Sequence, residues 1–351
     1  MTRPTLGEAS TERDRHARSV LFPGIGREGQ EAIRRASIVF VGVGAVGAAA
    51  AESAARAGVG RITLVDRDVV EESNLARQFL FDAADAERLA PKATAAVERL
   101  RAIDPGLEVT GRVADLDHRN AVEILRGHDL IFDGSDNFET RLLVSDASRF
   151  LGIPSIYAAC VGAEGRVAAF IPGRTPCLRC FLGGLPPAGS GPTCDTVGVV
   201  PTLPPLIAAA GMTEALHLLV HGDAARGMLM ATVWDGGFTA RRLLAASAPS
   251  PACPVCSEGR FPALDGEGAS DVVKLCGRRS VQVAPASPDR PDFDALEDRL
   301  RGVARVRRST HLLDADLDGV SLTIFADGRC VVRGTGDPAR ARSLYDRYVG
   351  R

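Results

Sequence analysis

Residues 37–47 read SIVFVGVGAVG, and this stretch decides the fold class. A short apolar run leads directly into Gly42, Gly44 and Gly47 in the spacing G-x-G-x-x-G, and an alanine-rich segment follows. A strand that turns straight into a helix presents free backbone N–H groups where the helix dipole is positive. Glycine lets that backbone approach a phosphate without a Cβ in the way. The stretch predicts a nucleotide-binding βα unit; taken alone, it fits an NAD- or FAD-binding Rossmann unit equally well.

Further along the chain, polar residues follow two more apolar runs. RITLVD ends at Asp66, about 20 residues after the glycines, where a carboxylate can accept hydrogen bonds from a ribose. DLIFDGSDN ends in Asp133, Asp136 and Asn137. Between the two runs lie Asp68, SNLARQ (73–78) and the pair Pro91-Lys92.

This series favours ATP over a nicotinamide cofactor. An enzyme that cuts between the α- and β-phosphates needs cations, because Arg and Lys neutralise charge as pyrophosphate leaves. Arg77 and Lys92 supply these cations, and Asn74 adds a polar side chain. All three follow Asp66, the carboxylate expected to bind the ribose, within one βα unit. Asp136, near the carboxyl end of the third apolar run, is placed to hold Mg²⁺ through oxygen ligands.

With these motifs the chain resembles the MoeB/ThiF family of ubiquitin-activating-like adenylyltransferases over residues 15–256, about two thirds of its length. The resemblance covers GVGAVG, AGVGRITLVDRDVVEESNLARQ, the Pro-Lys pair, DGSDNFETR, PCLRC, TCDTVGVVPTLPP and CPVC. It implies a doubly wound Rossmann-like α/β sheet of the ubiquitin-activating/MoeB type. It also implies ATP-dependent adenylation of the C-terminal glycine carboxylate of a small β-grasp sulfur carrier (ThiS- or MoaD-like, ending in Gly-Gly), with release of pyrophosphate.

The resemblance also implies a role for each matching residue. Asp66 would bind the ribose and Asp136 the Mg²⁺, while Arg18 would reach the γ-phosphate of the partner subunit's ATP, which implies a homodimer. The nucleotide-binding set is Gly42, Gly44, Gly47, Asp66, Asp68, Asn74, Arg77, Gln78, Lys92, Asp136 and Asn137. The chain departs from the family pattern in RHARS (15–19), which lacks a tyrosine and a glutamine, and at Ala76, where a glutamine is usual. No charged catalytic group is lost, so we expect activity.

The cysteines form a second constellation. Cys177 and Cys180 make one C-x-x-C pair, and Cys253 and Cys256 make another. Four thiolates match a tetrahedral Zn²⁺ site, but the long gap between the pairs leaves buried thiols or a redox pair open. The family resemblance supports a structural zinc that ties the end of the adenylation domain to its middle and does no chemistry.

Cys194 lies in the Gly/Pro-rich stretch GSGPTCDTVGVVPTLPP, which cannot form a long helix. The resemblance places it where several relatives carry a reactive cysteine that forms a thioester or an acyl disulfide with the activated carrier. A spectator cysteine is the alternative. A cysteine desulfurase or a rhodanese is the expected type of sulfur donor.

Length and composition complete the picture. The 351 residues suggest an adenylation domain over 1–262 and a small α+β domain over 270–351. A net charge of −2 and 45% apolar residues imply no nucleic-acid partner. We expect no membrane-spanning apolar run and no signal-peptide core, hence a cytoplasmic enzyme.

Three alternatives remain open on the sequence. One is an NAD-dependent oxidoreductase. Another is adenylation of a ubiquitin-like protein for conjugation, or of a peptide or a tRNA. The last is a partner subunit without catalysis, against which the retained Arg18, Arg77, Lys92 and Asp136 argue. The identity of the carrier and its pathway is not encoded in the motifs.

Overall fold

The computed structural model describes residues 15–182, 194–224, 227–243, 249–267, 272–275, 279–284, 291–317 and 319–349. The chain divides into two compact units, Met1–Leu185 with Val200–Asp265 and Pro186–Val199 with Gly266–Arg351. The domain limits 1–262 and 270–351 stay a prediction.

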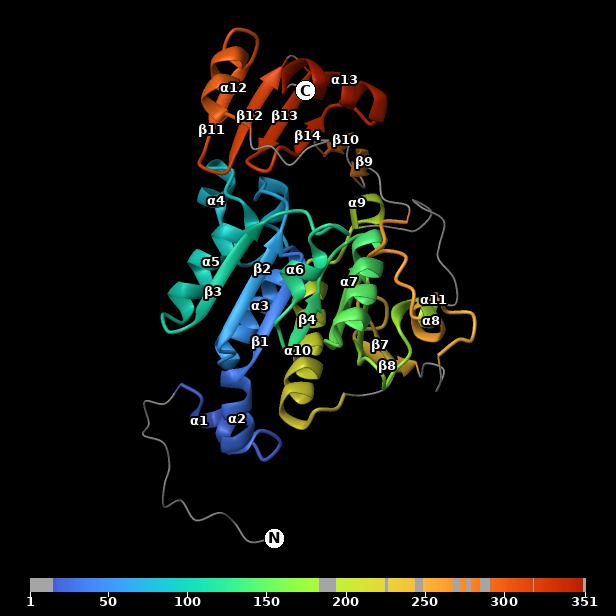
Figure 1. Ribbon diagram of the computed structural model, residues 1–351. Coiled ribbons are helices and arrows are strands. Elements are labelled where there is room, and N and C mark those ends of the chain that lie inside the picture. Colours follow the sequence, from blue (N-terminus) through green and yellow to red (C-terminus); the bar gives the residue numbers. More distant parts are fainter. Residues whose placement is uncertain are drawn as a thin grey trace. The chain divides into compact units, whose positions relative to one another are not determined.

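The first unit is built on an eight-stranded mixed sheet in the order β3-β2-β1-β4-β5-β6-β7-β8 (Figure 1). The strands from β3 to β5 are parallel, and the remaining pairs are antiparallel. Chain order reverses between β1 and β4, which is where ligands bind in open α/β sheets. The predicted doubly wound fold is confirmed. The strands are β1 (Ser37–Val41), β2 (Arg61–Asp66), β3 (Glu108–Val113), β4 (Leu130–Asp133), β5 (Ser155–Val161), β6 (Glu164–Phe170), β7 (Met228–Thr232) and β8 (Thr239–Leu243).

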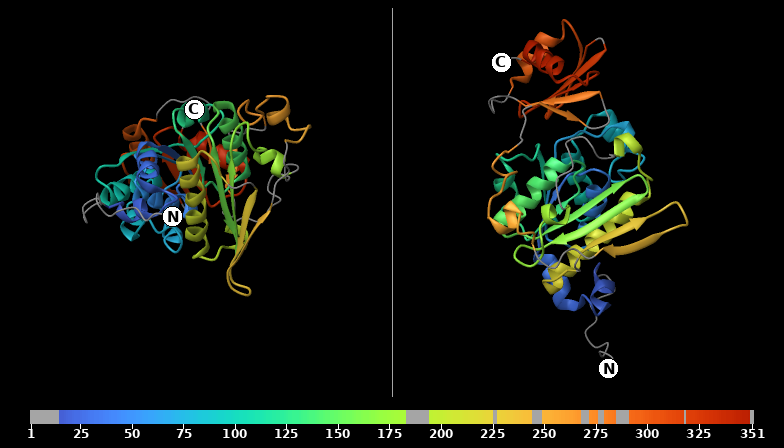
Figure 2. Two further views of the ribbon diagram at one scale, coloured as in Figure 1. Left: turned by 90° about the horizontal axis from the view of Figure 1, so that it is seen from below. Right: turned by 90° about the vertical axis from the view of Figure 1, so that its right-hand side faces the viewer.

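Helices cover both faces of this sheet (Figures 1 and 2). α3 (Ala45–Ala57), α5 (Lys92–Ile103) and α10 (Leu203–His221) pack on one face, and α6 (Ala121–Leu125) and α7 (Phe138–Leu151) on the other. Because both faces are covered, β1 and β4 are buried along their whole length, which explains their continuous apolar sequences. The shorter helices of the unit are α1 (Ala17–Leu21), α2 (Gly26–Arg35), η1 (Glu72–Asn74), α4 (Ala83–Glu87), α8 (Leu178–Leu182) and α11 (Pro254–Ser257).

α10 corrects the expectation that no apolar run of this chain is long enough to span a membrane. With 19 residues and a hydropathy of 1.4, it is long and apolar enough to span a membrane by length and composition alone. It packs against α3, β5 and β6, and its buried apolar residues, among them Ile207, Met212 and Leu218, belong to the core of the first unit.

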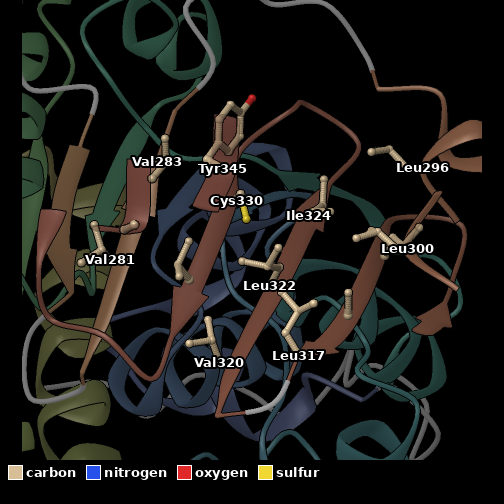
Figure 3. Close-up of a cluster of buried hydrophobic side chains, with 14 residues drawn as sticks. Val281, Val283, Leu296, Leu300, Leu317, Val320, Leu322, Ile324, Cys330 and Tyr345 are labelled. Atoms are coloured by element: carbon tan, nitrogen blue, oxygen red, sulfur yellow. The ribbon is translucent and has the colours of Figure 1, made fainter. Parts of the chain in front are cut away.

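The second unit is a six-stranded antiparallel sheet in the order β11-β12-β13-β14-β10-β9, with α12 (Phe293–Leu300) and α13 (Pro338–Tyr348). Side chains from alternate strand positions and from both helices form its core, including Leu322, Cys330 and Leu300 (Figure 3). The predicted small α+β domain is confirmed in its fold class. Its strands are β9 (Val272–Leu275), β10 (Ser280–Val283), β11 (Arg305–Arg308), β12 (Leu312–Leu317), β13 (Val320–Phe325) and β14 (Cys330–Arg333); α9 (Cys194–Val197) is grouped with this unit.

Candidate active site and metal centre

The glycine turn brings the amino end of α3 against the loop that follows β4. Gly42 has φ +82°, and a Cβ on it would lie 3.0 Å from the backbone of Gly134 and Ser135. A Cβ on Gly47 would overlap the carbonyl oxygen of Gly42. Gly44 is the N-cap of α3 and has no side chain to bond the free N–H groups, which remain available to a phosphate.

Replacing Gly47 by alanine tests this geometry. The added methyl group has to displace the Gly42 carbonyl, so we expect the turn to deform and the free energy of unfolding to fall by about 2–3 kcal/mol. Nucleotide affinity should fall at least tenfold, measured by calorimetric titration with ATP. Ala48→Gly, one position along α3, is the control and should cost only about 1 kcal/mol of stability while keeping ATP affinity.

Asp66 closes the turn from the end of β2. Its Oδ2 accepts a hydrogen bond from the N–H of Val43 at 2.6 Å, and its Oδ1 accepts one from the N–H of Asp68 at 2.7 Å. Burial raises the pKa of Asp66, against the opposing charge of Lys92. The carboxylate is therefore fixed beside the glycines, and its remaining lone pairs can bind a ribose hydroxyl.

Lys92 is the first residue of α5 and is 7% exposed. Its Nζ donates to Oδ2 of Asp68 at 3.2 Å, and its backbone N–H donates to the carbonyl of Asp68 at 2.9 Å. Burial alone lowers the pKa of Lys92, but the charges of Asp68, Asp66 and Asp136 outweigh it and raise the pKa above its usual value. Lys92 is thus a cation at neutral pH, held among three carboxylates.

The segment 71–78 supplies the polar residues next to the turn. Asn74 is buried, and its Oδ1 accepts a hydrogen bond from the N–H of Glu71 at 3.1 Å, so it stabilises η1 itself. Arg77 is half-buried and donates to the carbonyl of Ser73 at 2.7 Å. Gln78 is 4% exposed, its Nε2 faces Gly44, and its Oε1 has no hydrogen-bond partner among the described residues. A buried amide left unsatisfied beside the glycine turn fits a ligand at that place.

Asp136 and Asn137 stand on the neighbouring loop, between β4 and α7. Asn137 is the N-cap of α7, and its Oδ1 accepts a hydrogen bond from the N–H of Thr140 at 2.8 Å. Asp136 is exposed, and its charge acts on Lys92 across the site. The structure therefore brings Asp66, Asp68, Lys92 and Asp136 to the carboxyl ends of β2 and β4, around the glycine turn. An exposed carboxylate here has the oxygen donors that Mg²⁺ prefers.

The sequence did not predict a role for two charged pairs at the site. Arg67 donates to both carboxylate oxygens of Asp115, at 3.2 and 3.3 Å. Asp133 and Arg141 are both buried: Asp133 accepts hydrogen bonds from the N–H and the hydroxyl of Ser135, and Arg141 donates to its carbonyl oxygen. The only signal for Asp133 and Arg141 is their presence in the motif DGSDNFETR.

One of the predicted catalytic residues, Arg18, is not brought to this site by its own chain. Arg18 lies in α1, and the adjoining Arg15 pairs with Asp104 at 3.0 Å, at the carboxyl end of α5. In Figure 1, α1 lies at the end of the sheet where β1 begins, whereas Asp136 follows the carboxyl end of β4. Cys194 begins α9, but its side chain lies outside the described residues, so its predicted role stays a prediction.

The two C-x-x-C pairs form one cluster in the first unit. The sulfur atoms of Cys177, Cys180, Cys253 and Cys256 all lie within 4.8 Å of one another. The distances from Sγ of Cys177 are 3.8 Å to Cys180 and 3.6 Å to Cys253. Four ligands about 2.3 Å from a tetrahedral Zn²⁺ lie about 3.8 Å apart, so the donor set fits this metal.

α7 supports both halves of the cysteine cluster. Asp146, fully buried on α7, accepts two hydrogen bonds from Arg179, both at 3.0 Å, between Cys177 and Cys180. The same carboxylate accepts the N–H of Ala263, just beyond the second pair, at 2.9 Å. The first pair and the segment after the second are therefore fixed to one helix.

Comparisons with known proteins show the family of the chain. The model of the ThiF family matches residues 16–255. The chain is 40% identical over 337 residues to the sulfur carrier protein ThiS adenylyltransferase of Bacillus subtilis, which covers 96% of this chain and 99% of that protein. It is 36% identical over 276 residues to the SAMP-activating enzyme E1 of Haloferax volcanii, covering 78% of this chain and 98% of that protein.

Solved structures show the same fold. Escherichia coli MccB with ATP matches with a TM-score of 0.59 at 20% identity, covering 70% of this chain and 75% of that one. The family match over 16–255 spans more than half of the chain, and the Bacillus relative aligns along nearly its whole length. The chain therefore belongs to the ThiF family.

Proposed function

We propose that this protein is an adenylyltransferase that uses ATP to activate the C-terminal glycine carboxylate of a small ubiquitin-like sulfur-carrier protein, releasing pyrophosphate. The observation that carries the proposal is the group of Asp66, Lys92 and Asp136 around the glycine turn. Its support from relatives is the 40% identity, over 96% of the chain, to a protein named as a ThiS adenylyltransferase.

Different residues of the site would bind different parts of the nucleotide. The free N–H groups at the start of α3 would donate hydrogen bonds to a phosphate, and Asp66 would bind the ribose. Lys92 and Arg77 would contact the triphosphate, and Gln78 would offer its unsatisfied Oε1 to the nucleotide. Asp136, with Asn137 beside it, would hold Mg²⁺, which neutralises phosphate charge when bound.

The reaction needs little acid–base chemistry. The carrier carboxylate is already a nucleophile: its oxygen bonds to the α-phosphorus while the bond from that phosphorus to the bridging oxygen breaks. Carrier-AMP forms, and pyrophosphate takes the electron pair. Lys92, cationic in its carboxylate surroundings, and Arg77 stabilise the charge that develops on the leaving oxygens. Catalysis is then mostly positioning and electrostatic stabilisation.

The proposal includes a homodimer in which each subunit supplies Arg18 to its partner's site. Arg18 is exposed on α1, which lies at the end of the sheet where β1 begins, whereas Asp136 follows the carboxyl end of β4, so a second subunit would have to present Arg18 to the site. Leu21 and Phe22, which follow it, are 72% and 61% exposed, and apolar side chains of this size suit a contact with a second copy.

Further parts of the proposal concern sulfur. The carrier would end in Gly-Gly, as the family resemblance implies, because a tail without side chains can bring its backbone close to the α-phosphate. Sulfur from a cysteine desulfurase or a rhodanese would then displace AMP, with Cys194 as the candidate thiol for a covalent intermediate. Cys194→Ser should leave pyrophosphate exchange unchanged and affect only the sulfur-transfer step.

The cysteine cluster would hold a structural Zn²⁺. Removal of the metal with a chelator, or Cys177→Ser, should lower the free energy of unfolding by about 3 kcal/mol, because the cross-link between distant segments is lost. The melting temperature should fall by about 5–10 °C. Exchange activity per folded molecule should persist, since the cluster is closed to substrate. Cys330→Ser, at a buried cysteine outside the cluster, is the control that should leave zinc content unchanged.

The decisive experiment is ATP–pyrophosphate exchange by the purified protein with a panel of Gly-Gly-ending carriers from the same source. Exchange that depends on one carrier would support adenylation and identify the pathway. No exchange with any carrier, in folded and zinc-loaded protein, would contradict the proposal.

A further inference from the structure

The loop that carries Asp136 is held at Ser135 by two buried polar side chains, those of Asp133 and Arg141. Oδ1 of Asp133 accepts hydrogen bonds from the backbone N–H of Ser135 at 3.0 Å and from its hydroxyl at 2.6 Å. Arg141, one turn into α7, donates to the carbonyl oxygen of Ser135 at 2.8 Å. Asp133 is 3% exposed and Arg141 is 9% exposed. We call Asp133, Ser135 and Arg141 the Ser135 clamp.

Arg141 is itself held firmly. Its guanidinium lies 5.1 Å from the ring centre of Tyr157 on β5 and 5.5 Å from that of Phe138 on α7. Its Nε has no hydrogen-bond partner among the described residues. Burial of a charged group with an unsatisfied donor is costly, so stability alone does not explain this arrangement. In a low-dielectric surrounding, the hydrogen bonds to Ser135 are stronger than the same bonds in water.

Asp136 depends on this loop for its orientation. Its carboxylate is exposed, and its hydrogen bond from Nδ2 of Asn137 is long, at 3.4 Å. The neighbouring Gly134 packs against Gly47, where a Cβ would come within 3.0 Å of the Gly47 backbone. The backbone of 134–136 is therefore bounded by the glycine turn on one side and by the clamp on the other.

We propose that Asp133 and Arg141 are positioning residues that set the Asp136 carboxylate where it holds the metal of Mg·ATP. The proposal deepens the adenylation function proposed above and rests on it. Residues that orient a metal ligand typically change metal affinity or activity by about 10- to 100-fold when altered. The expected signature is therefore a higher Mg²⁺ requirement together with a slower reaction.

Two conservative variants test the clamp by activity. Asp133→Asn keeps the acceptor shape but loses the charge, and Arg141→Lys keeps the charge but loses the planar fork. We expect pyrophosphate exchange to fall about 10- to 100-fold in each, and half-saturation to need more Mg²⁺, while ATP affinity without Mg²⁺ stays within about twofold. Arg61→Lys is the matched control: Arg61 donates to the hydroxyl of Ser37 and to the carbonyl of Gly127, at the other end of the sheet.

A double-mutant cycle separates positioning from a general structural role. If the clamp acts through Asp136, Arg141→Lys should cost little further activity in an Asp136→Asn background, whereas Arg61→Lys should cost the same in both backgrounds. An equal loss from Arg141→Lys in both backgrounds would overturn the proposal.

A second measurement does not depend on activity. Amide hydrogen exchange at Ser135 and Asp136 should be about tenfold faster in Arg141→Lys and Asp133→Asn than in the wild type, and unchanged in Arg61→Lys. Unchanged exchange in all variants would refute the clamp even if adenylation is shown. Absence of pyrophosphate exchange in the wild type would instead refute the proposed function, while the amide rates still decide whether the clamp holds.

Discussion

Replacing Lys92 by methionine is expected to lower the rate of ATP–pyrophosphate exchange by about 10³-fold. Methionine keeps most of the buried volume of the lysine side chain. It removes the positive charge that pairs with the Asp68 carboxylate. Loss of one group that stabilises transition-state charge costs about 10²- to 10³-fold in comparable sites. Removing Lys92 also leaves Asp66 and Asp68 facing each other without the cation that lowers the pKa of Asp66, which weakens ribose binding as well.

The measurement is exchange at saturating carrier, with kcat and the KM for ATP separated. We expect the larger effect on kcat, because the charge on the leaving pyrophosphate develops only in the transition state. Lys92→Arg should recover part of the rate, since it restores the charge in a different shape. Arg101→Met, on the exposed side of the same helix, should stay within about twofold of the wild type. A Lys92→Met enzyme with full kcat would show that the assigned role is wrong.

The central sheet was predictable from the sequence for a physical reason. Parallel strands buried on both faces are continuous apolar runs, and IVFV of β1 and LIFD of β4 are of this kind. The residues that follow such strands meet at one edge of the sheet, so Asp66 and Asp136 were expected near the glycine turn. Lys92 lies beside these carboxylates because an antiparallel β-bridge between Val69 and Pro91 brings the start of α5 back to the same edge of the sheet.

The parts that could not be predicted depend on contacts between distant segments. The pairing of Arg67 with Asp115 joins the residues after β2 and β3, 48 positions apart, and no local pattern marks it. β11 (Arg305–Arg308) has too many arginines to be recognised as a strand, and only its pairing with β12, where Arg307 meets Asp314 at 2.8 Å, makes it one. Arg18 was assigned to a nucleotide site by resemblance alone, and its own chain places it at the opposite end of the sheet.

Because α1 places Arg18 away from the site of its own chain, the second large expected effect is a loss of exchange activity that two different subunits can restore together. Arg18→Ala and Asp136→Ala should each lower exchange by about 10³-fold if the proposed roles hold, because the first would remove a cation from the γ-phosphate and the second would remove the Mg²⁺ ligand. If Arg18 acts across a homodimer, a heterodimer of the two variants contains one site with both defects and one site with neither.

Mixing the two variants therefore gives a result that neither gives alone. After equal amounts are unfolded together and refolded, about half of the dimers should be mixed, and total activity should recover to about a quarter of the wild-type value. Recovery should be absent when Arg18→Ala is mixed with Arg18→Ala carrying a second tag, which controls for refolding. If Arg18 acts within its own chain, every site in the mixture carries one defect and activity stays near 10⁻³ of the wild type. A quarter of the activity thus requires that Arg18 of one subunit completes the site built by Asp136 of the other.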